Sequence, residues 1–230
     1  MRILIALAVS GLTAVSGLTA SSGARAVSSV RALPSPSADT ASLRKRLDSI
    51  ADAHHGIVGY SIIDLGTGQR ISRRGDETFP TASLIKVGVL ITVFDLVAKG
   101  QLSLDDPLTL LRIDQVPGSG SLQFMHNGMI LTVRDAAWLM STISDNTATN
   151  LLLDRIVIRR MWAKMDSLGV PHTKIYAKVY QRIASVAPDS SVKYGLGSTT
   201  PNEMAHLFEL LAAGKAVNPS ADSTMLDILE

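Results

Sequence analysis

Residues 83–99 are apolar on nearly every side, with Lys86 as the only charged residue between Ser83 and Phe94. Their spacing predicts a helix, and a helix without a polar face must be covered by neighbouring elements. Three other stretches have helical spacing and can supply that cover: residues 132–143, 147–156 and 201–211. The sequence therefore predicts a largely helical body around residues 83–99.

The segment before this body has the pattern of one helix followed by a β-hairpin. Residues 42–54 place apolar side chains at helical spacing between charged ones, which is typical of a surface helix, and Gly56 ends it. Residues 56–65 are rich in β-branched side chains and predict a buried strand. Gly66-Thr67-Gly68 then turns the chain into a second strand at 70–73. We therefore expect two antiparallel strands after the first helix.

Size and composition limit the classes of protein that this chain can represent. Its 230 residues, 46% hydrophobic and 18% charged, suit one well-packed domain over residues 42–230. A formal net charge of +2, from 22 basic and 20 acidic residues, offers no basic stripe to a nucleic acid backbone. Aromatic residues make up only 4% of the chain, so few are available for base stacking. These features exclude nucleic acid as a partner.

The first 26 residues have the pattern of an export signal. Arg2 precedes an apolar run at 3–18, and Ala24-Arg25-Ala26 is a small-residue cleavage site. That run contains serine, threonine and glycine and is shorter than the roughly 20 apolar residues of a membrane span, which disfavours a permanent anchor. Residues 27–41, rich in proline, serine and alanine, predict a flexible tether. The chain has no cysteine, which excludes a lipid-modified N-terminal cysteine and disulfides, and we expect a soluble monomer that is periplasmic or secreted.

Ser83 and Lys86 are three residues apart, so a helix places them on one face within hydrogen-bonding distance. Burial among apolar residues lowers the pKa of a lysine, and a neutral lysine can take the proton of a serine nucleophile. Pro80 and Thr81 indicate a helix start just before Ser83, which would put the nucleophile near the positive end of the helix dipole. The alternative is a buried lysine that is merely satisfied by its neighbours.

The same spacing also occurs by chance at two other places in the chain. Ser42 and Lys45 belong to the predicted surface helix, and Ser190 and Lys193 lie in a polar segment. We interpret both of these pairs as solvated side chains, because nothing in their surroundings would lower the pKa of the lysine.

Ser144-Asp145-Asn146 falls at the break between the helices predicted at 132–143 and 147–156. From the frequencies of the three residue types, a chance match is expected only roughly 0.04 times in such a chain. A break between two helices suits side chains that point into a cleft. The alternative is an ordinary helix cap, in which Ser144 or Asp145 caps the helix that begins at Thr147.

Ser-x-x-Lys at 83–86 followed by Ser144-Asp145-Asn146 resembles the class A β-lactamases and penicillin-binding proteins. The resemblance covers residues 42–213. It implies that Ser83 is the acylated nucleophile and Lys86 its proton acceptor. Ser144 would relay a proton to the leaving nitrogen, Asn146 would bind the substrate's amide side chain, and Asp145 would brace the turn. It also implies a β-lactamase/transpeptidase-like α/β fold, an α+β sandwich with a helical subdomain and an antiparallel sheet.

Two departures from the family pattern bear on activity. Class A enzymes deacylate with a water activated by a loop glutamate, but no glutamate lies between Asn146 and Asn202, and the expected position near 173–182 reads Lys-Ile-Tyr-Ala-Lys-Val-Tyr-Gln. We therefore expect acylation without efficient deacylation. The third family motif, Lys-Thr-Gly or Lys-Ser-Gly, does not occur, and Lys193-Tyr194-Gly195 is interpreted as a loop. We expect a catalytic domain truncated at its C-terminus, with the last strands of the sheet missing.

Two other functions stay open. A D-alanyl-D-alanine peptidase shares the two serines and the lysine and lacks the deacylating glutamate, and a non-enzymatic β-lactam binder or inactive remnant would explain both departures. The five histidines are scattered and match no zinc motif. We expect no metal and no cofactor, and a partner that is a small β-lactam or a peptide of the peptidoglycan type.

Overall fold

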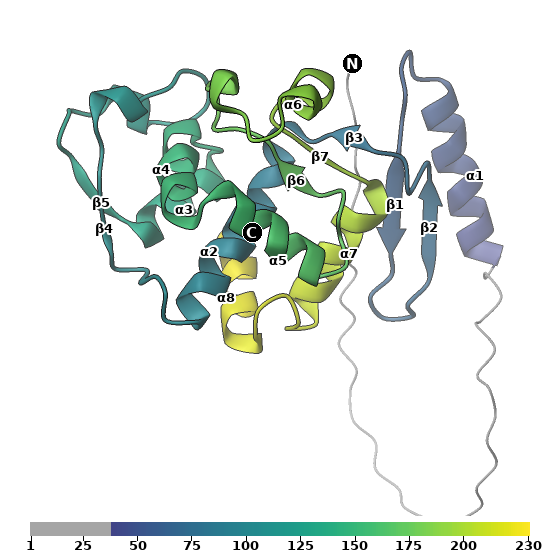
Figure 1. Ribbon diagram of the computed structural model, residues 1–230. Helices are drawn as coiled ribbons and strands as arrows, with labels where there is room; N and C mark the ends of the chain where they lie inside the picture. Colours follow the sequence, from purple (N-terminus) through teal and green to yellow (C-terminus); the bar gives the residue numbers. More distant parts are fainter. Residues whose placement is uncertain (1–37) are drawn as a thin grey trace, which may run out of the picture. The chain divides into compact units, whose positions relative to one another are not determined.

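The computed structural model describes residues 38–230 (Figure 1). The chain divides into two compact units, the first ending at Arg73 and the second beginning at Arg74. The expected signal peptide at 1–26 and the tether residues 27–37 lie outside the described residues. Within residues 38–230, no helix is both long and apolar enough to cross a membrane.

The first unit contains the predicted helix and hairpin. The elements are α1 (Ala38–Asp52), β1 (Tyr60–Ile63) and β2 (Arg70–Arg73), and the two strands pair antiparallel with Tyr60 opposite Arg73. The helix begins at Ala38, four residues before the predicted start at residue 42. Residues 38–41 follow Pro36 and contain no proline or glycine, so they can join the helix. Arg73 pairs with Asp48 at 3.4 Å and Asp52 at 2.6 Å, which ties β2 to α1.

The second unit is a helical body built around α2 (Lys86–Ala98). Its other α-helices are α3 (Val133–Thr142), α4 (Asn146–Ile156), α5 (Ile158–Ser167), α6 (Pro188–Tyr194), α7 (Pro201–Ala212) and α8 (Pro219–Leu229). The helices predicted at 132–143, 147–156 and 201–211 are confirmed to within one residue at each end. Helix α2 packs against α3, α4, α5 and α8 (Figure 1).

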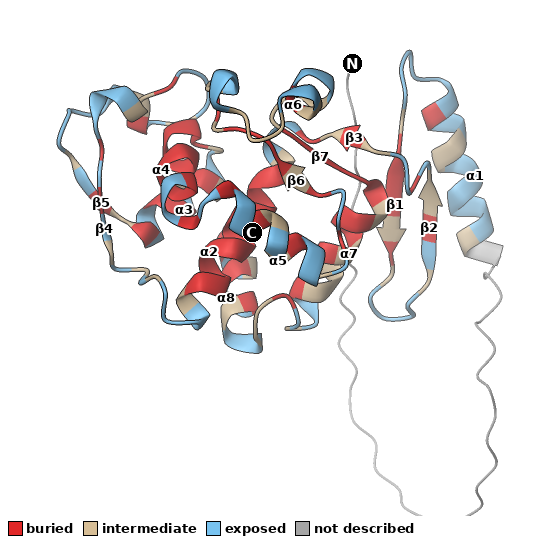
Figure 2. Ribbon diagram, viewed as in Figure 1, coloured by how far each residue is buried: buried red, intermediate tan, exposed pale blue. Residues whose placement is uncertain are grey.

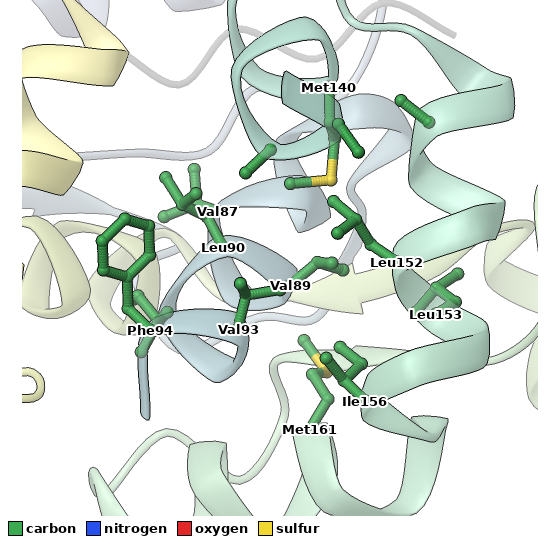
Figure 3. Packing of buried hydrophobic residues seen from close by; sticks show 14 of the residues in the cluster. Val87, Val89, Leu90, Val93, Phe94, Met140, Leu152, Leu153, Ile156 and Met161 are labelled. Atoms are coloured by element: carbon green, nitrogen blue, oxygen red, sulfur yellow. The ribbon is translucent and has the colours of Figure 1, made fainter. Parts of the chain in front are cut away.

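Helix α2 is buried along most of its length, as its lack of a polar face predicts (Figure 2). Val89, Leu90 and Val93 are 0% exposed and pack with side chains of α3, α4 and α5 (Figure 3). Gly88 allows α5 to approach closely, since a Cβ there would lie 2.4 Å from the Met161 methyl carbon. Asp95 is also buried and pairs with Lys164 of α5 at 2.8 Å, which compensates its charge.

The second unit also contains short strands that the sequence did not predict. Strands β3 (Phe79–Pro80), β7 (Gly197–Thr199) and β6 (Lys174–Ile175) form an antiparallel sheet in that order, and β4 (Pro107–Thr109) pairs with β5 (Ile130–Thr132). Strands of two or three residues show no alternation of polar and apolar side chains, which is the signal used to predict strands.

Two expectations are corrected in this unit, and one helix is added. The helix predicted over 83–99 begins as a 3-10 helix, η1 (Ala82–Ile85), before the α-helix starts at Lys86. Lys193 and Tyr194 belong to α6 and not to a loop, because Pro188 starts a helical turn there and Gly195, at φ 75°, ends it. Helix α5 was not predicted, although it follows α4 after a single residue, Val157, at φ 62°.

Three more 3-10 helices lie in loops of this unit: η2 (Arg112–Asp114), η3 (Leu122–Phe124) and η4 (Arg182–Ala184). The first two flank a loop that approaches the start of α4, as described below.

Candidate active site

Ser83 lies in η1, directly after β3 and directly before α2. Ala82 has φ 45°, a left-handed conformation that is costly for a residue with a side chain. The Thr81 backbone N–H donates to the Gly197 carbonyl at 3.0 Å, which anchors the segment to β7. Ser83 is exposed, as a nucleophile must be. The sharp change of direction between β3 and α2 therefore presents Ser83 at the N-terminal end of the buried helix.

Lys86 is the first residue of α2 and is only 4% exposed. Its Nζ donates to the Ser144 carbonyl at 2.6 Å, the Ser144 Oγ at 3.0 Å and the Asn146 Oδ1 at 3.0 Å. The structure therefore brings Lys86 together with Ser144 and Asn146, which are 58 and 60 residues away in the sequence. All three protons of a charged ammonium are used in these contacts.

Burial lowers the pKa of Lys86 to about 8, while the negative charge of Asp145 raises it and partly opposes the shift. A lysine with this pKa is neutral in about a tenth of molecules at pH 7. A neutral amine retains two protons for the oxygens around it and frees a lone pair. Lys86 therefore has the environment that a general base requires.

The predicted hydrogen bond between Ser83 and Lys86 is not formed in the described part of the chain, where the Lys86 protons go to Ser144 and Asn146. The physical reason is that an ammonium has three protons, and the Ser144 carbonyl, the Ser144 Oγ and the Asn146 Oδ1 accept all of them, which leaves none for the Ser83 Oγ. The other two Ser-x-x-Lys pairs have exposed lysines, Lys45 and Lys193, as predicted for solvated side chains.

Ser144 lies between α3 and α4 and has φ 57°. This left-handed residue turns the chain so that both its carbonyl and its hydroxyl face Lys86. The strain is local, because helix α4 begins two residues later at Asn146. Two strained non-glycine residues therefore lie in this region: Ala82 precedes Ser83, and Ser144 is a hydrogen-bond partner of Lys86. Such residues cluster at functional sites.

Asp145 is 1% exposed and performs two structural tasks. Its Oδ1 accepts from the Ala148 N–H at 2.9 Å, which caps α4. Its Oδ2 accepts from the N–H groups of Ser121 at 2.7 Å and Leu122 at 2.9 Å. The Asp145 carboxylate therefore both caps α4 and braces the turn before it. The same contacts bind the 117–122 loop to the start of α4.

Asn146 connects this loop to Lys86. Its Nδ2 donates to the Pro117 carbonyl at 3.0 Å and its backbone N–H donates to the Ser119 carbonyl at 3.0 Å, while its Oδ1 accepts from Lys86. The Asn146 amide is therefore fixed in orientation from both ends. One Nδ2 proton remains for another acceptor.

Gly120 is the point where the loop comes closest to Asp145. It has φ 103°, and a Cβ on it would lie 2.2 Å from the Asp145 Cγ. Gly120→Ala is expected to lower the free energy of unfolding by more than about 3 kcal/mol, because it adds a clash to an unfavourable backbone conformation. Urea denaturation followed by circular dichroism measures this change.

Gly128 provides the matched control for this substitution. It has φ 87° but no atom within 4 Å of a built Cβ, so Gly128→Ala carries only the backbone cost of about 1–2 kcal/mol. Equal losses in the two variants would show that the contact of Gly120 with Asp145 contributes nothing.

Two residues beside this cluster were missed by the sequence analysis. Asn150 is 0% exposed, and its side-chain amide donates to the Val179 carbonyl at 3.1 Å and accepts from the Val179 N–H at 2.8 Å. Tyr180 follows directly, in the segment where the family glutamate is expected. The position of Asn150 one helical turn after Asn146 was the available signal, because residues four apart share a helix face.

Within residues 38–230, no group of three or more histidine, cysteine, aspartate or glutamate side chains is arranged to hold a metal ion. The polar cluster at Lys86 instead has the composition of a proton-transfer site: one amine, one hydroxyl and one amide.

A family model described as "Beta-lactamase enzyme family" matches residues 42–230. The chain belongs to this family. Membership in the beta-lactamase family accounts for the two motifs meeting at Lys86, and it confirms the resemblance inferred from residues 83–86 and 144–146. Among curated relatives, a beta-lactamase of Rhodobacter capsulatus is 27% identical over 165 residues, which is 71% of this chain and 54% of the relative.

Solved structures of the beta-lactamase family have the same fold. The crystal structure of a beta-lactamase from Sphaerobacter thermophilus is 33% identical, with a TM-score of 0.73 over 82% of this chain and 69% of that one. PBP-A, solved as an acyl-enzyme complex with penicillin G after a leucine was replaced by glutamate, is 26% identical, with a TM-score of 0.72 over 82% of this chain and 68% of that one. The predicted combination of helices with antiparallel sheet is therefore confirmed.

This beta-lactamase family member spans only part of the length of its curated relatives. It covers 54% of the Rhodobacter capsulatus protein and 60% of the beta-lactamase AER-1 of Aeromonas hydrophila. The family and the fold are therefore established over the matched residues.

Proposed function

We propose that this protein is a serine β-lactamase-like hydrolase that forms an acyl-enzyme at Ser83 with β-lactam-type amides. The observation that carries the proposal is the buried Lys86 Nζ, with a pKa of about 8, placed 3.0 Å from the Ser144 Oγ. Membership in the beta-lactamase family supports the reaction class.

The proposed acylation moves one proton in a closed cycle. Neutral Lys86 accepts the proton of the Ser83 hydroxyl while the Ser83 oxygen bonds to the lactam carbonyl carbon. The carbon–nitrogen bond of the ring then breaks, and the proton passes from Lys86 through the Ser144 hydroxyl to the departing nitrogen. Lys86 returns to its neutral form, and the whole β-lactam stays attached to Ser83.

We further propose that deacylation is slow. No glutamate lies between Asn146 and Asn202, and two of the aspartates there are engaged on the surface, Asp154 with Lys178 and Asp166 with Lys174. Water near the ester then lacks the carboxylate base that class A enzymes supply. A variant of PBP-A in which glutamate replaces a leucine is similar to this chain and was solved as an acyl-enzyme complex with penicillin G. That complex supports acylation, and the expectation of slow deacylation rests on the missing glutamate alone.

Intact-mass spectrometry after incubation with benzylpenicillin tests the proposal. The protein is expected to gain the full mass of one benzylpenicillin, because ring opening loses no atoms, and to keep it for at least minutes. Ser83→Ala should gain nothing, whereas Ser190→Ala, from the Ser-x-x-Lys pair on α6 whose lysine is exposed, should react like the unmodified protein. An adduct that survives in Ser83→Ala contradicts the assignment of the nucleophile, and rapid turnover contradicts slow deacylation.

The absence of the loop glutamate favours one second candidate, a D-alanyl-D-alanine peptidase. Such an enzyme would use the same Ser83, Lys86 and Ser144 on a peptide substrate. Release of D-alanine from purified muropeptides separates the two functions. In either case we propose an exported protein, as the pattern of residues 1–26 indicates.

A further inference from the structure

Tyr180 has a strained backbone in the segment where the family glutamate is expected. Its φ is 60°, and it is one of five non-glycine residues with positive φ among residues 38–230. Two of the others are Ala82 and Ser144, which lie beside the nucleophile and the lysine. A strained conformation persists only where the surroundings impose it, and such residues cluster at functional sites.

The surroundings that impose this conformation come from α4. Val179 is clamped by both hydrogen bonds of the buried Asn150 amide. Lys178, one residue earlier, pairs with Asp154 of the same helix. Asn150 follows Asn146 by one helical turn, so the clamp fixes Tyr180 relative to the residue that contacts Lys86.

Gly118 shows where the phenol lies. A Cβ built on Gly118 would be 2.8 Å from the Asn146 Nδ2, 3.2 Å from the Tyr180 Oη and 3.5 Å from the Tyr180 Cε2. The amide nitrogen and the phenol oxygen therefore lie beside the same face of Gly118 and are at most about 6 Å apart, so that one acceptor can be within hydrogen-bonding distance of both. A side chain at residue 118 would collide with the Asn146 amide, and its φ of 95° also suits glycine.

The two flanking groups are both donors with capacity to spare. Tyr180 is 65% exposed, and within the described residues its hydroxyl makes no hydrogen bond. The Asn146 Nδ2 uses one proton on the Pro117 carbonyl and keeps the other. One N–H donor and one O–H donor that lie close together are suited to bind a carbonyl oxygen. The acylamino side chain of a penicillin carries such an oxygen.

We propose that Tyr180 is a specificity-determining residue whose hydroxyl, together with the Asn146 amide, binds the carbonyl oxygen of the substrate's acylamino side chain. This inference rests on the proposed function, because it assigns a substrate group to the same site. The segment that contains Tyr180 would then select the substrate, whereas the glutamate expected there in class A enzymes would activate a water for deacylation.

The test compares two penicillins that differ only in the group concerned. Benzylpenicillin carries an acylamino side chain, whereas 6-aminopenicillanic acid has the same bicyclic core with a free amine. The second-order rate constant for acylation of Ser83 is measured for the full chain and for Tyr180→Phe, which keeps the ring and removes the hydroxyl. Tyr194→Phe, at the end of α6, is the matched control.

Tyr180→Phe is expected to lower the rate with benzylpenicillin about 3- to 10-fold, as the loss of one hydrogen bond predicts, and to leave the rate with 6-aminopenicillanic acid unchanged. Tyr194→Phe should change neither rate. Equal effects on the two compounds, or no effect on either, would overturn this inference while leaving acylation at Ser83 in place. Failure of the unmodified protein to react with both compounds would overturn the proposed function and this inference with it.

Discussion

Lys86→Met is expected to lower the rate of Ser83 acylation by about 10³-fold, because the substitution keeps the length of the side chain and removes the amine proposed to accept the Ser83 proton. Stopped-flow or mass-spectrometric measurement with benzylpenicillin gives the rate directly. Lys193→Met, in the exposed Ser-x-x-Lys pair of α6, is the matched control and should leave the rate unchanged. A loss of less than tenfold in Lys86→Met would mean that another group accepts the Ser83 proton.

The same assignment predicts how the acylation rate depends on pH. Burial lowers the pKa of Lys86 to about 8, and the neutral amine is the reactive form. Raising the pH from 6 to 7 should therefore increase the rate about tenfold, and the increase should level off above pH 8. A rate that falls as the pH rises through this range would mean that the charged lysine is the active form.

The burial that lowers the pKa of Lys86 also lowers the free energy of unfolding wherever the lysine is charged. Because the folded-state pKa of Lys86 lies below its unfolded value of 10.5, the unfolded chain binds more protons between about pH 8 and 10.5. The contribution of Lys86 to the free energy of unfolding therefore rises with pH across that window. Below pH 8 the lysine is charged in both states, and the cost of burying its charge no longer changes with pH. A destabilising buried lysine is expected where it has a role in catalysis, as proposed for Lys86.

The spacing of the motifs in the sequence predicted which residues form this cluster, and the roles assigned to them stay predictions. Ser83 and Lys86 are three positions apart, which means about one helical turn, and Ser144-Asp145-Asn146 at a helix break is too rare to expect by chance. The contact of Lys86 with Ser144 and Asn146 joins segments 58 and 60 residues apart. No local pattern encodes that distance, and it was inferred only through the family resemblance.

What the sequence missed is nonlocal or conformational. The strands β3, β6 and β7 exist because distant segments pair with one another, and two or three residues leave no periodic trace. The positive φ of Ser144 and Tyr180 is imposed by tertiary contacts and contradicts the local preference of both residue types. Asn150 looked like one more polar residue of a helix, and only its contacts with Val179 identify it as a clamp.

Asp145→Ala is expected to reduce the free energy of unfolding by about 3 kcal/mol, since it removes three charge-assisted hydrogen bonds and leaves three backbone donors in the interior without that partner. Urea denaturation measures the loss. Asp154→Ala, which removes a half-exposed surface ion pair with Lys178, is the matched control and should cost less than about 1 kcal/mol.

The milder variant Asp145→Asn removes the charge and keeps one of the two accepting oxygens. An asparagine at this position can still cap α4 through its Oδ1, but its Nδ2 cannot accept from the Ser121 and Leu122 N–H groups, and the negative charge that raises the pKa of Lys86 is lost. The pH profile of acylation should therefore shift to lower pH in Asp145→Asn, with a larger fraction of neutral lysine at pH 7. A profile that stays in place would show that Asp145 acts on the site only by holding the 117–122 loop against α4, with no electrostatic effect on the base.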